Sequence, residues 1–236
     1  MAEEMFSLND YFDRIGFRGK ADVSFETLNA LHTAHTLNIP FENLDVYYKR
    51  PLLLDKESLF KKIVTGKRGG YCFEMNGLFS FVLREIGFKV TDLLAGGRLH
   101  QILMVEIGDD RYLADVGFGN DGITSPLLLV EGLEQKQFTN TYRFGAEPKF
   151  DFALQRKAGD EFITMYAFTL QECSPLDFMI SNHFTATYPK SFFNSMRMCT
   201  MPTKEGRITL TDKHFKVVEN GETVETAIAD DEEFNT

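Results

Sequence analysis

The most informative stretch of this sequence is Arg68-Gly69-Gly70-Tyr71-Cys72-Phe73-Glu74. Apolar residues with helical spacing follow it, so Cys72 is expected in the first turn of a helix. Backbone N–H groups at a helix N-terminus favour a thiolate over a thiol, and the preceding glycines leave room for close approach to the sulfur. The position fits a reactive cysteine, but a buried cysteine that acts as a small hydrophobic residue fits it equally well.

Residues 1–87 carry four apolar patterns with helical spacing. Serine or aspartate stands before three of them, and glycine or proline follows all four. The predicted helices run from Ser7 to Gly16, from Ser24 to Pro40, from Asp55 to Gly66 and from Cys72 to Gly87. We therefore expect a small helical bundle. Arg68 could add positive potential near the thiol or pair with a buried carboxylate such as Glu42.

The spacing of apolar residues changes to that of strands from about Val90. Gly108-Asp109-Asp110 separates two strand-like runs, which predicts a hairpin. Runs with strand character cover 101–107, 111–116, 126–130, 139–144, 150–155 and 161–170, and later 207–211, 214–219 and 222–228. The chain is therefore expected to be an α+β protein, in which an antiparallel sheet or partial barrel follows the helices.

Composition argues against several classes of function. The chain has 236 residues, a formal net charge of −10 and a pI near 5.0, which disfavours sequence-independent binding of nucleic acid. No apolar run is long enough to cross a membrane, and the acidic N-terminus lacks the pattern of a signal peptide. Three cysteines without paired spacing argue against a disulfide framework and against a zinc site. We expect a protein of the reducing cytoplasm that holds no metal.

A nucleophilic cysteine needs a base and a group that orients the base. His100 opens an apolar strand, and Asp115 lies between two apolar residues, where a carboxylate is costly to bury without a partner. These two residues are therefore the candidate base and orienter. A two-residue turn at 109–110 would pair Asp115 with Met104 and leave His100 about 13 Å away along the ladder. Contact then requires a bulge, a bend or a different pairing.

The remaining histidines have more ordinary explanations. His32 and His35 fall in or near the second predicted helix, where packing or capping is the commoner role. His214 is expected at the surface of a tail strand. His183 could form part of a pocket wall, although a surface position is favoured. His100 is therefore the preferred base.

Four sequence blocks carry a family resemblance, and they run in the family's order over about residues 5–230. They are IPFENLD at 39–45, RGGYCFE at 68–74 with NGLF at 76–79, His100 with DVGFG at 115–119, and YAFT at 166–169. In these blocks the chain resembles the arylamine N-acetyltransferases. The resemblance implies a triad of Cys72, His100 and Asp115. It also implies a cysteine-protease-like core in three parts: a helical bundle at 1–87, a β-barrel-like domain at 88–188 and an α/β lid at 189–236.

The resemblance also implies an activity. Members of this family move an acetyl group from acetyl-CoA to arylamines, arylhydrazines or N-hydroxyarylamines, by a ping-pong mechanism through an acetyl-cysteine, as in xenobiotic metabolism. The implied partners are CoA and a small aromatic amine or hydrazine, for a chain that is a monomer or a weak homo-oligomer. Phe41 and Phe118 match positions that line the acceptor pocket, and Phe192 is a further candidate. Plain core packing is the alternative role of these phenylalanines.

Three features depart from the family pattern. Met75 stands where glutamine is usual, the interval from Cys72 to His100 looks short, and a further terminal helix would be expected after Thr236. Three other functions fit some of the same residues. They are an amide synthase of the same family that closes macrolactams, a papain- or transglutaminase-like thiol hydrolase, and an acidic interaction domain without enzymatic activity.

Overall fold

The computed structural model describes residues 6–235, and its N-terminal part is helical as predicted. The helices are α1 (Leu8–Ile15), α2 (Phe25–Asn38), α3 (Leu44–Tyr47), α4 (Lys56–Phe60) with the π-helical turn η1 (Lys61–Thr65), and α5 (Cys72–Ile86). The predicted caps are confirmed, because the side chains of Ser7, Ser24 and Asp55 each accept a backbone N–H from the first turn. Gly16 and Gly87 end α1 and α5 in the left-handed conformation.

An antiparallel sheet of eight strands follows the helices, in the order β5-β4-β3-β2-β9-β8-β7-β6. Its strands are β2 (Lys89–Ala95), β3 (His100–Ile107), β4 (Asp110–Ala114), β5 (Leu127–Leu128), β6 (Gln135–Gln137), β7 (Asn140–Gly145), β8 (Phe152–Ala158) and β9 (Glu161–Phe168). Helix α5 packs on β2 and β3. Phe79 and Val82 of the helix share one buried cluster with Leu103 and Val105 of β3, so the helix that begins at Cys72 and the strand that begins at His100 form one hydrophobic core.

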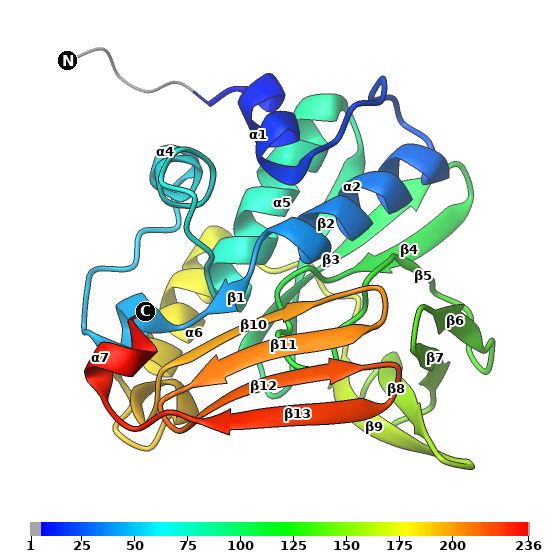
Figure 1. The fold of residues 1–236 in the computed structure, drawn as a ribbon. Coiled ribbons are helices and arrows are strands. Elements are labelled where there is room, and N and C mark those ends of the chain that lie inside the picture. Colours follow the sequence, from blue (N-terminus) through cyan, green and yellow to red (C-terminus); the bar gives the residue numbers. More distant parts are fainter. Residues whose placement is uncertain (1–5, 236) are drawn as a thin grey trace.

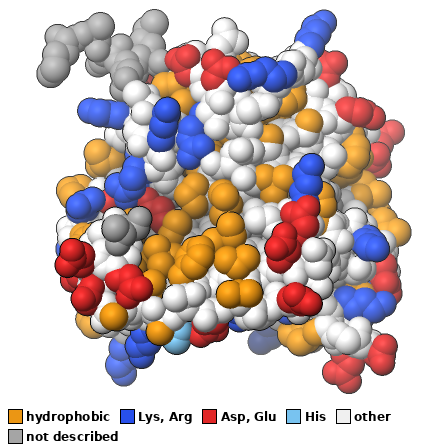
Figure 2. Space-filling view, viewed as in Figure 1, with side chains coloured by type: hydrophobic (Ala, Val, Ile, Leu, Met, Phe, Trp, Pro, Cys, Tyr) orange, Lys and Arg blue, Asp and Glu red, His pale blue; other side chains and the backbone are white. Residues whose placement is uncertain are grey.

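A second sheet has the order β1-β10-β11-β12-β13 and contains strands from opposite ends of the sequence. Its members are β1 (Phe41–Glu42), β10 (Met198–Pro202), β11 (Gly206–Thr211), β12 (His214–Glu219) and β13 (Glu222–Ala227). Figure 1 shows α1, α2 and α5 above this sheet, with β6 to β9 beside it. Hydrophobic side chains gather over its strands on the face seen in Figure 2. The pairing of β1 with β10 ties residues near the nucleophile to the C-terminal sheet.

Three expectations about local structure were wrong. Helix α6 (Pro175–Thr187) lies where no helix was predicted, and β10 was not predicted as a strand. The hairpin of β3 and β4 pairs Ile107 with Asp110 and Met104 with Leu113, so the predicted pairing of Met104 with Asp115 is incorrect. Gly108 adopts a φ of 60°, which makes Gly108-Asp109 the two-residue turn and shifts the register. The division into three parts at 87 and 188 stays a prediction.

Among the helices of residues 6–235, none is both long enough and apolar enough to cross a membrane.

Candidate active site

Cys72 is the first residue of α5, and the chain before it is held closely. The Glu74 side chain accepts the Tyr71 N–H at 3.2 Å, which caps the helix start. A Cβ on Gly69 would lie 2.0 Å from the Pro40 carbonyl oxygen, so only glycine fits there. The Cys72 side chain is buried, and its Sγ lies 3.9 Å from the Leu99 carbonyl oxygen. The thiol is therefore fixed at the helix N-terminus, as the sequence predicted.

His100 and Asp115 are in direct contact. The His100 Nε2 atom lies 2.7 Å from Asp115 Oδ2. His100 begins β3, whereas Asp115 follows directly after Ala114, the partner of Leu103 at the end of the β3–β4 ladder. The observed register therefore brings the carboxylate two positions nearer to His100 than the predicted register did. A different pairing, one of the three routes considered from the sequence, thus supplies part of the approach, and Asp115 lies beyond the end of β4 at Ala114.

Asp115 is held by donors that carry no charge. Its carboxylate accepts hydrogen bonds from Asn76 Nδ2 at 2.9 Å and from the Tyr166 hydroxyl at 2.8 Å. Its backbone N–H donates to His32 Nε2 at 3.1 Å. Burial raises the pKa of Asp115, but the His100 charge and the hydrogen bonds from His100, Asn76 and Tyr166 lower it further, to below its usual value. The carboxylate is therefore ionised at neutral pH.

The same contacts set the charge of His100. Burial would lower the pKa of His100, but the Asp115 carboxylate, with a smaller contribution from Cys72, raises it to about 10. An imidazolium beside the sulfur stabilises a thiolate electrostatically. The pair of His100 and Asp115 is therefore arranged to keep a proton near Cys72 at neutral pH.

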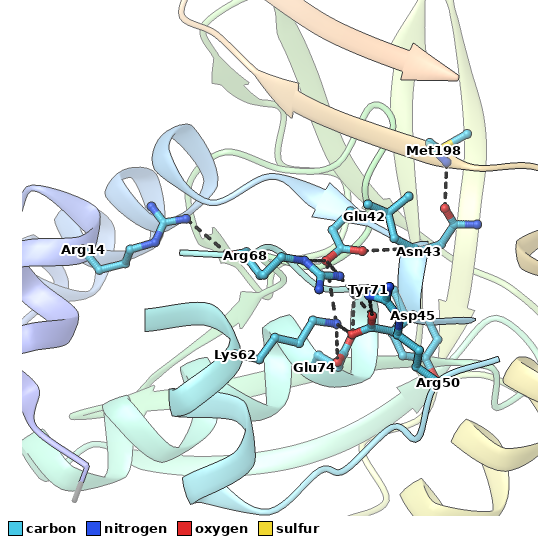
Figure 3. Close-up of polar contacts among 11 residues, drawn as sticks. Arg14, Glu42, Asn43, Asp45, Arg50, Lys62, Arg68, Tyr71, Glu74 and Met198 are labelled. Atoms are coloured by element: carbon cyan, nitrogen blue, oxygen red, sulfur yellow. Dashed lines mark hydrogen bonds and ion pairs between the residues drawn. The ribbon is translucent and has the colours of Figure 1, made fainter. Parts of the chain in front are cut away.

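A separate cluster of charges lies beneath the loop that leads to Cys72 (Figure 3). The Lys62 ammonium contacts Glu74 at 2.7 Å and Asp45 at 2.8 Å. The Arg68 guanidinium contacts Glu42 at 2.6 Å and Asp45 at 3.2 Å. The predicted pairing of Arg68 with Glu42 is therefore confirmed. We call these five residues the charge cluster.

The charge cluster joins three segments of chain around the nucleophile. Glu42 belongs to β1, Lys62 belongs to η1, and Glu74 belongs to the first turn of α5. The Arg14 guanidinium adds α1 to the assembly by donating to the Arg68 carbonyl oxygen at 3.3 Å. Burial raises the pKa of Glu74, against the opposing effect of the Lys62 charge. The cluster thus anchors the glycine loop without touching the thiol.

An aromatic cavity opens beside the triad. Its volume is about 510 Å³, and Phe41, Phe118 and Phe192 all line it. The ring centroids of Phe118 and His100 lie 5.3 Å apart, so a residue of the cavity wall packs against His100. Phe41 is buried, whereas Phe192 is half exposed. The fold brings together all three phenylalanines singled out from the sequence.

Several residues at the site were not assigned a role from the sequence. Phe193 lines the aromatic cavity, and Asn76, Tyr166 and His32 hold Asp115. Asn76 and Tyr166 lie inside the quoted family blocks, and that was a usable signal. His32 carried none beyond being a histidine in an apolar pattern, because its contact with Asp115 joins residues far apart in the sequence.

Apart from the contact of His32 with Asp115, the other histidines are buried in the core or exposed. His32 and His35 are fully buried, as expected for packing, and His214 is exposed and contacts Glu225 at 2.8 Å. His183 is exposed on α6. Within residues 6–235 no group of three or more His, Cys, Asp or Glu side chains is placed to hold a metal ion.

Comparison with known proteins places this geometry in a family. A family profile described as N-acetyltransferase matches residues 24–236. The arylamine N-acetyltransferase of Escherichia coli K12 is 42% identical over 229 residues, which cover 92% of this chain and 81% of the relative. This chain belongs to the arylamine N-acetyltransferase family. The sequence prediction of an acyltransferase enzyme is thereby confirmed.

Solved members of the arylamine N-acetyltransferase family share the fold. The Salmonella typhimurium enzyme superposes with a TM-score of 0.92 at 34% identity, over 98% of this chain and 89% of that chain. A Mycobacterium marinum enzyme, solved in complex with CoA, gives a TM-score of 0.91 at 31% identity, over 96% of this chain and 89% of that chain. The predicted α+β fold with a barrel-like antiparallel sheet is therefore confirmed.

Proposed function

We propose that this protein transfers an acetyl group from acetyl-CoA to arylamines, arylhydrazines or N-hydroxyarylamines by a ping-pong mechanism through acetyl-Cys72. One observation carries the proposal: the thiol at the start of α5 lies beside a His100–Asp115 pair, and Phe118, which packs against His100, lines an aromatic cavity. Membership of the family supports the same chemistry. The family match favours the transferase over a macrolactam synthase or a thiol hydrolase.

In the first half-reaction the Cys72 thiolate attacks the carbonyl carbon of the acetyl thioester. The tetrahedral oxyanion meets the backbone N–H of Cys72, which has no partner within the helix because it lies in the first turn. The C–S bond to CoA then breaks, and CoA leaves as a thiol with the proton that His100 held. The charge balance is preserved, because the thiolate of the protein and the proton of the imidazolium are both consumed.

In the second half-reaction a neutral aromatic amine attacks the acetyl carbon on Cys72. His100 takes the amine proton as the thiolate leaves, which restores the ion pair. Acylation removes the contribution of the sulfur to the raised pKa of His100, and this favours the neutral imidazole, the form that can take a proton from the amine. Phe41 and Phe118 offer aromatic faces on which an aniline ring can stack.

The acyl intermediate must survive until an acceptor arrives. Cys72 is only 3% exposed, so bulk water has little access to the thioester. A reducing cytoplasm would keep the thiol free, and we retain that location, with a monomer or weak homo-oligomer, as part of the proposal. No metal takes part in any of these steps.

The decisive experiment is incubation with acetyl-CoA in the absence of an acceptor, followed by intact-mass measurement and peptide mapping. We expect one acetyl group on the peptide that contains Cys72, and its loss when aniline is added. Cys72→Ala should give no adduct and no transfer, while Cys199→Ala, which changes a cysteine outside the triad, should behave as the parent protein. Hydrolysis of acetyl-CoA with no adduct, or an adduct on another cysteine, would contradict the proposal.

A further inference from the structure

Arg207 is a cation for which the fold provides no matching anion. Its guanidinium carries five N–H donors, yet the one side-chain hydrogen bond found for it runs from Nη1 to the Thr200 hydroxyl at 3.1 Å. Among residues 6–235 neither Arg207 nor the nearby Lys216 has a carboxylate within the 4.0 Å that defines an ion pair. A partly buried guanidinium with unused donors is unfavourable unless a ligand satisfies them.

The polar face of the second sheet groups these donors. Thr200, Thr209 and Lys216 lie opposite one another on β10, β11 and β12, so their side chains share one face. Arg207 lies two residues before Thr209 on β11 and therefore points to the same side. The Oγ1 atoms of Thr200 and Thr209 are 2.9 Å apart, which confirms the arrangement. Two cations and two hydroxyls thus form a row across three strands.

This row lines a cleft of about 530 Å³, which we call the sheet cleft. Its opposite wall is polar and comes from the barrel-like sheet and its loops, including Asn120, Thr139 and Asn140. Asn120, Asp121 and Met198 also line the aromatic cavity. The sheet cleft therefore adjoins the aromatic cavity.

The acidic groups of the sheet cleft do not neutralise it. Asp121 Oδ2 lies 3.5 Å from Arg156 Nη2, so its ion pair is formed with Arg156. Burial lowers the pKa of Arg207 against the opposing influence of Asp121, but an arginine remains charged at neutral pH. Glu205, the other acidic residue of the lining, is exposed. Among residues 6–235 the cleft thus holds two cations, Arg207 and Lys216, that form no ion pair, although Asp121 acts on Arg207 from a longer distance.

We propose that Arg207 and Lys216 form an anion site that binds phosphate groups of the CoA part of the donor, with the thioester arm passing Asn120 and Met198 into the aromatic cavity. This inference rests on the proposed acetyl-CoA-dependent function. A guanidinium matches phosphate oxygens with two parallel hydrogen bonds, and Lys216 supplies a second positive charge. The carboxylate of an anionic acceptor has related chemistry, and the test separates the two sources.

The test compares two acetyl donors with aniline as the acceptor: acetyl-CoA and the phosphate-free thioester S-acetyl-N-acetylcysteamine. For acetyl-CoA we expect kcat/KM to fall about 10- to 100-fold in Arg207→Gln, because hydrogen bonds to a charged group are lost, and about 2- to 5-fold in Lys216→Gln. For the phosphate-free thioester we expect both variants to match the parent protein. Lys213→Gln removes an exposed charge from the turn between β11 and β12, and transfer from either donor should be unchanged.

Other outcomes overturn the assignment in different ways. An equal loss with both donors would mean that Arg207 supports the fold rather than the donor. A loss that appears only when 4-aminobenzoate replaces aniline would assign the site to the acceptor. A parent protein that transfers acetyl groups from neither donor would refute the proposed function instead of the site.

A binding measurement covers the case in which Arg207→Gln fails to fold. Adenosine 3′,5′-bisphosphate should inhibit the parent protein competitively against acetyl-CoA and only weakly against the phosphate-free thioester. Lys216→Gln should weaken that inhibition. Inhibition of the same strength against both donors would overturn the phosphate site.

Discussion

Two buried groups of polar residues flank the start of α5, and they are built in opposite ways. Around Asp115 a single carboxylate receives hydrogen bonds from an amide, a hydroxyl and His100. In the charge cluster three carboxylates face Lys62 and Arg68, with Arg50 at 3.3 Å from Asp45. Neutral donors leave the charge of Asp115 to act on His100, whereas the charge cluster largely neutralises itself.

This difference suits the residues around Asp115 to setting the charge of His100, and it suits the charge cluster to stabilising the fold. A carboxylate whose neighbours are neutral keeps its field for the one titratable group beside it, and this raises the pKa of His100 to about 10. A self-neutralised cluster has little field left to act on the thiol, but breaking it strands a buried charge. Changes around Asp115 should therefore reduce the rate, and changes in the charge cluster should reduce the stability.

The largest effect is expected from His100→Gln. Glutamine keeps a polar side chain but carries no transferable proton at neutral pH, so acetylation of Cys72 should slow by at least about 10³-fold. Stopped-flow release of CoA measures the rate of acetylation, and thermal unfolding measures whether the variant keeps its stability. If His100→Gln kept a near-native rate, another base would be required, and His183 would be tested next.

Asp115→Asn tests whether the Asp115 carboxylate sets the charge of His100. In the parent protein the imidazolium persists below about pH 10 and is lost as the pH rises through that value. Removal of the carboxylate takes away the main influence that raises the pKa of His100, so the imidazolium should be lost at a lower pH. The rate of acetylation should fall about 10²- to 10⁴-fold.

The pH profile of Cys72 alkylation by iodoacetamide checks the direction of that shift. Below pH 10 the parent thiolate is supported by the imidazolium, so Asp115→Asn should need a higher pH for the same alkylation rate. An unchanged profile would mean that Asp115 does not set the charge of His100.

Lys62→Met addresses the supporting region. It leaves Glu42, Asp45 and Glu74 together without the ammonium, and it should lower the free energy of unfolding by about 3–5 kcal/mol. Lys56→Met is the matched control, because Lys56 of α4 forms an ion pair at the surface with Glu85 of α5 at 3.0 Å. The loss of this pair should lower the free energy of unfolding by about 0–1 kcal/mol. Urea unfolding compares the two. A similar small loss in both variants would show that the charge cluster is not an anchor.

The smallest effect is expected from Tyr166→Phe. It removes one neutral donor from Asp115 Oδ2 while keeping the ring that packs 5.2 Å from His100. One net hydrogen bond contributes about 1 kcal/mol, so kcat/KM should fall about 5-fold. The pH profile of alkylation should move in the same direction as in Asp115→Asn, but by less. A larger effect than that of Asp115→Asn would reverse the roles assigned to the two residues.

The part of the site that sequence could predict consists of local features. Cys72 at a helix start follows from the glycine pair and the apolar spacing after it, and the capped ends of α1, α2 and α4 follow from Ser7, Ser24 and Asp55. The sequence also contains a start signal for helix α6, because Ser174 and Asp177 form a capping box at the N-terminus of Pro175–Thr187. This helix could therefore have been predicted from local sequence.

Contacts between distant segments could not be predicted in the same way. The His100–Asp115 distance depends partly on the register of one hairpin. The predicted pairing would leave a gap of about 13 Å, whereas the observed pairing brings Asp115 two positions nearer, just beyond the end of β4 at Ala114. Strand β10 pairs with β11 on one side and, on the other, with Phe41 and Glu42 from the opposite end of the chain. The row of Arg207, Thr209 and Lys216 likewise depends on strand pairing.

The amino-acid sequence alone determined the place of Cys72 at a helix start, the order of helices before strands and the family blocks, because each of these rests on neighbours within a few turns or strands. The folded chain added the charge of His100, the anchor beneath the glycine loop and the unpaired cation of Arg207. These depend on burial and on distances of a few ångströms between residues that lie far apart along the chain, and no periodicity in a sequence records such distances.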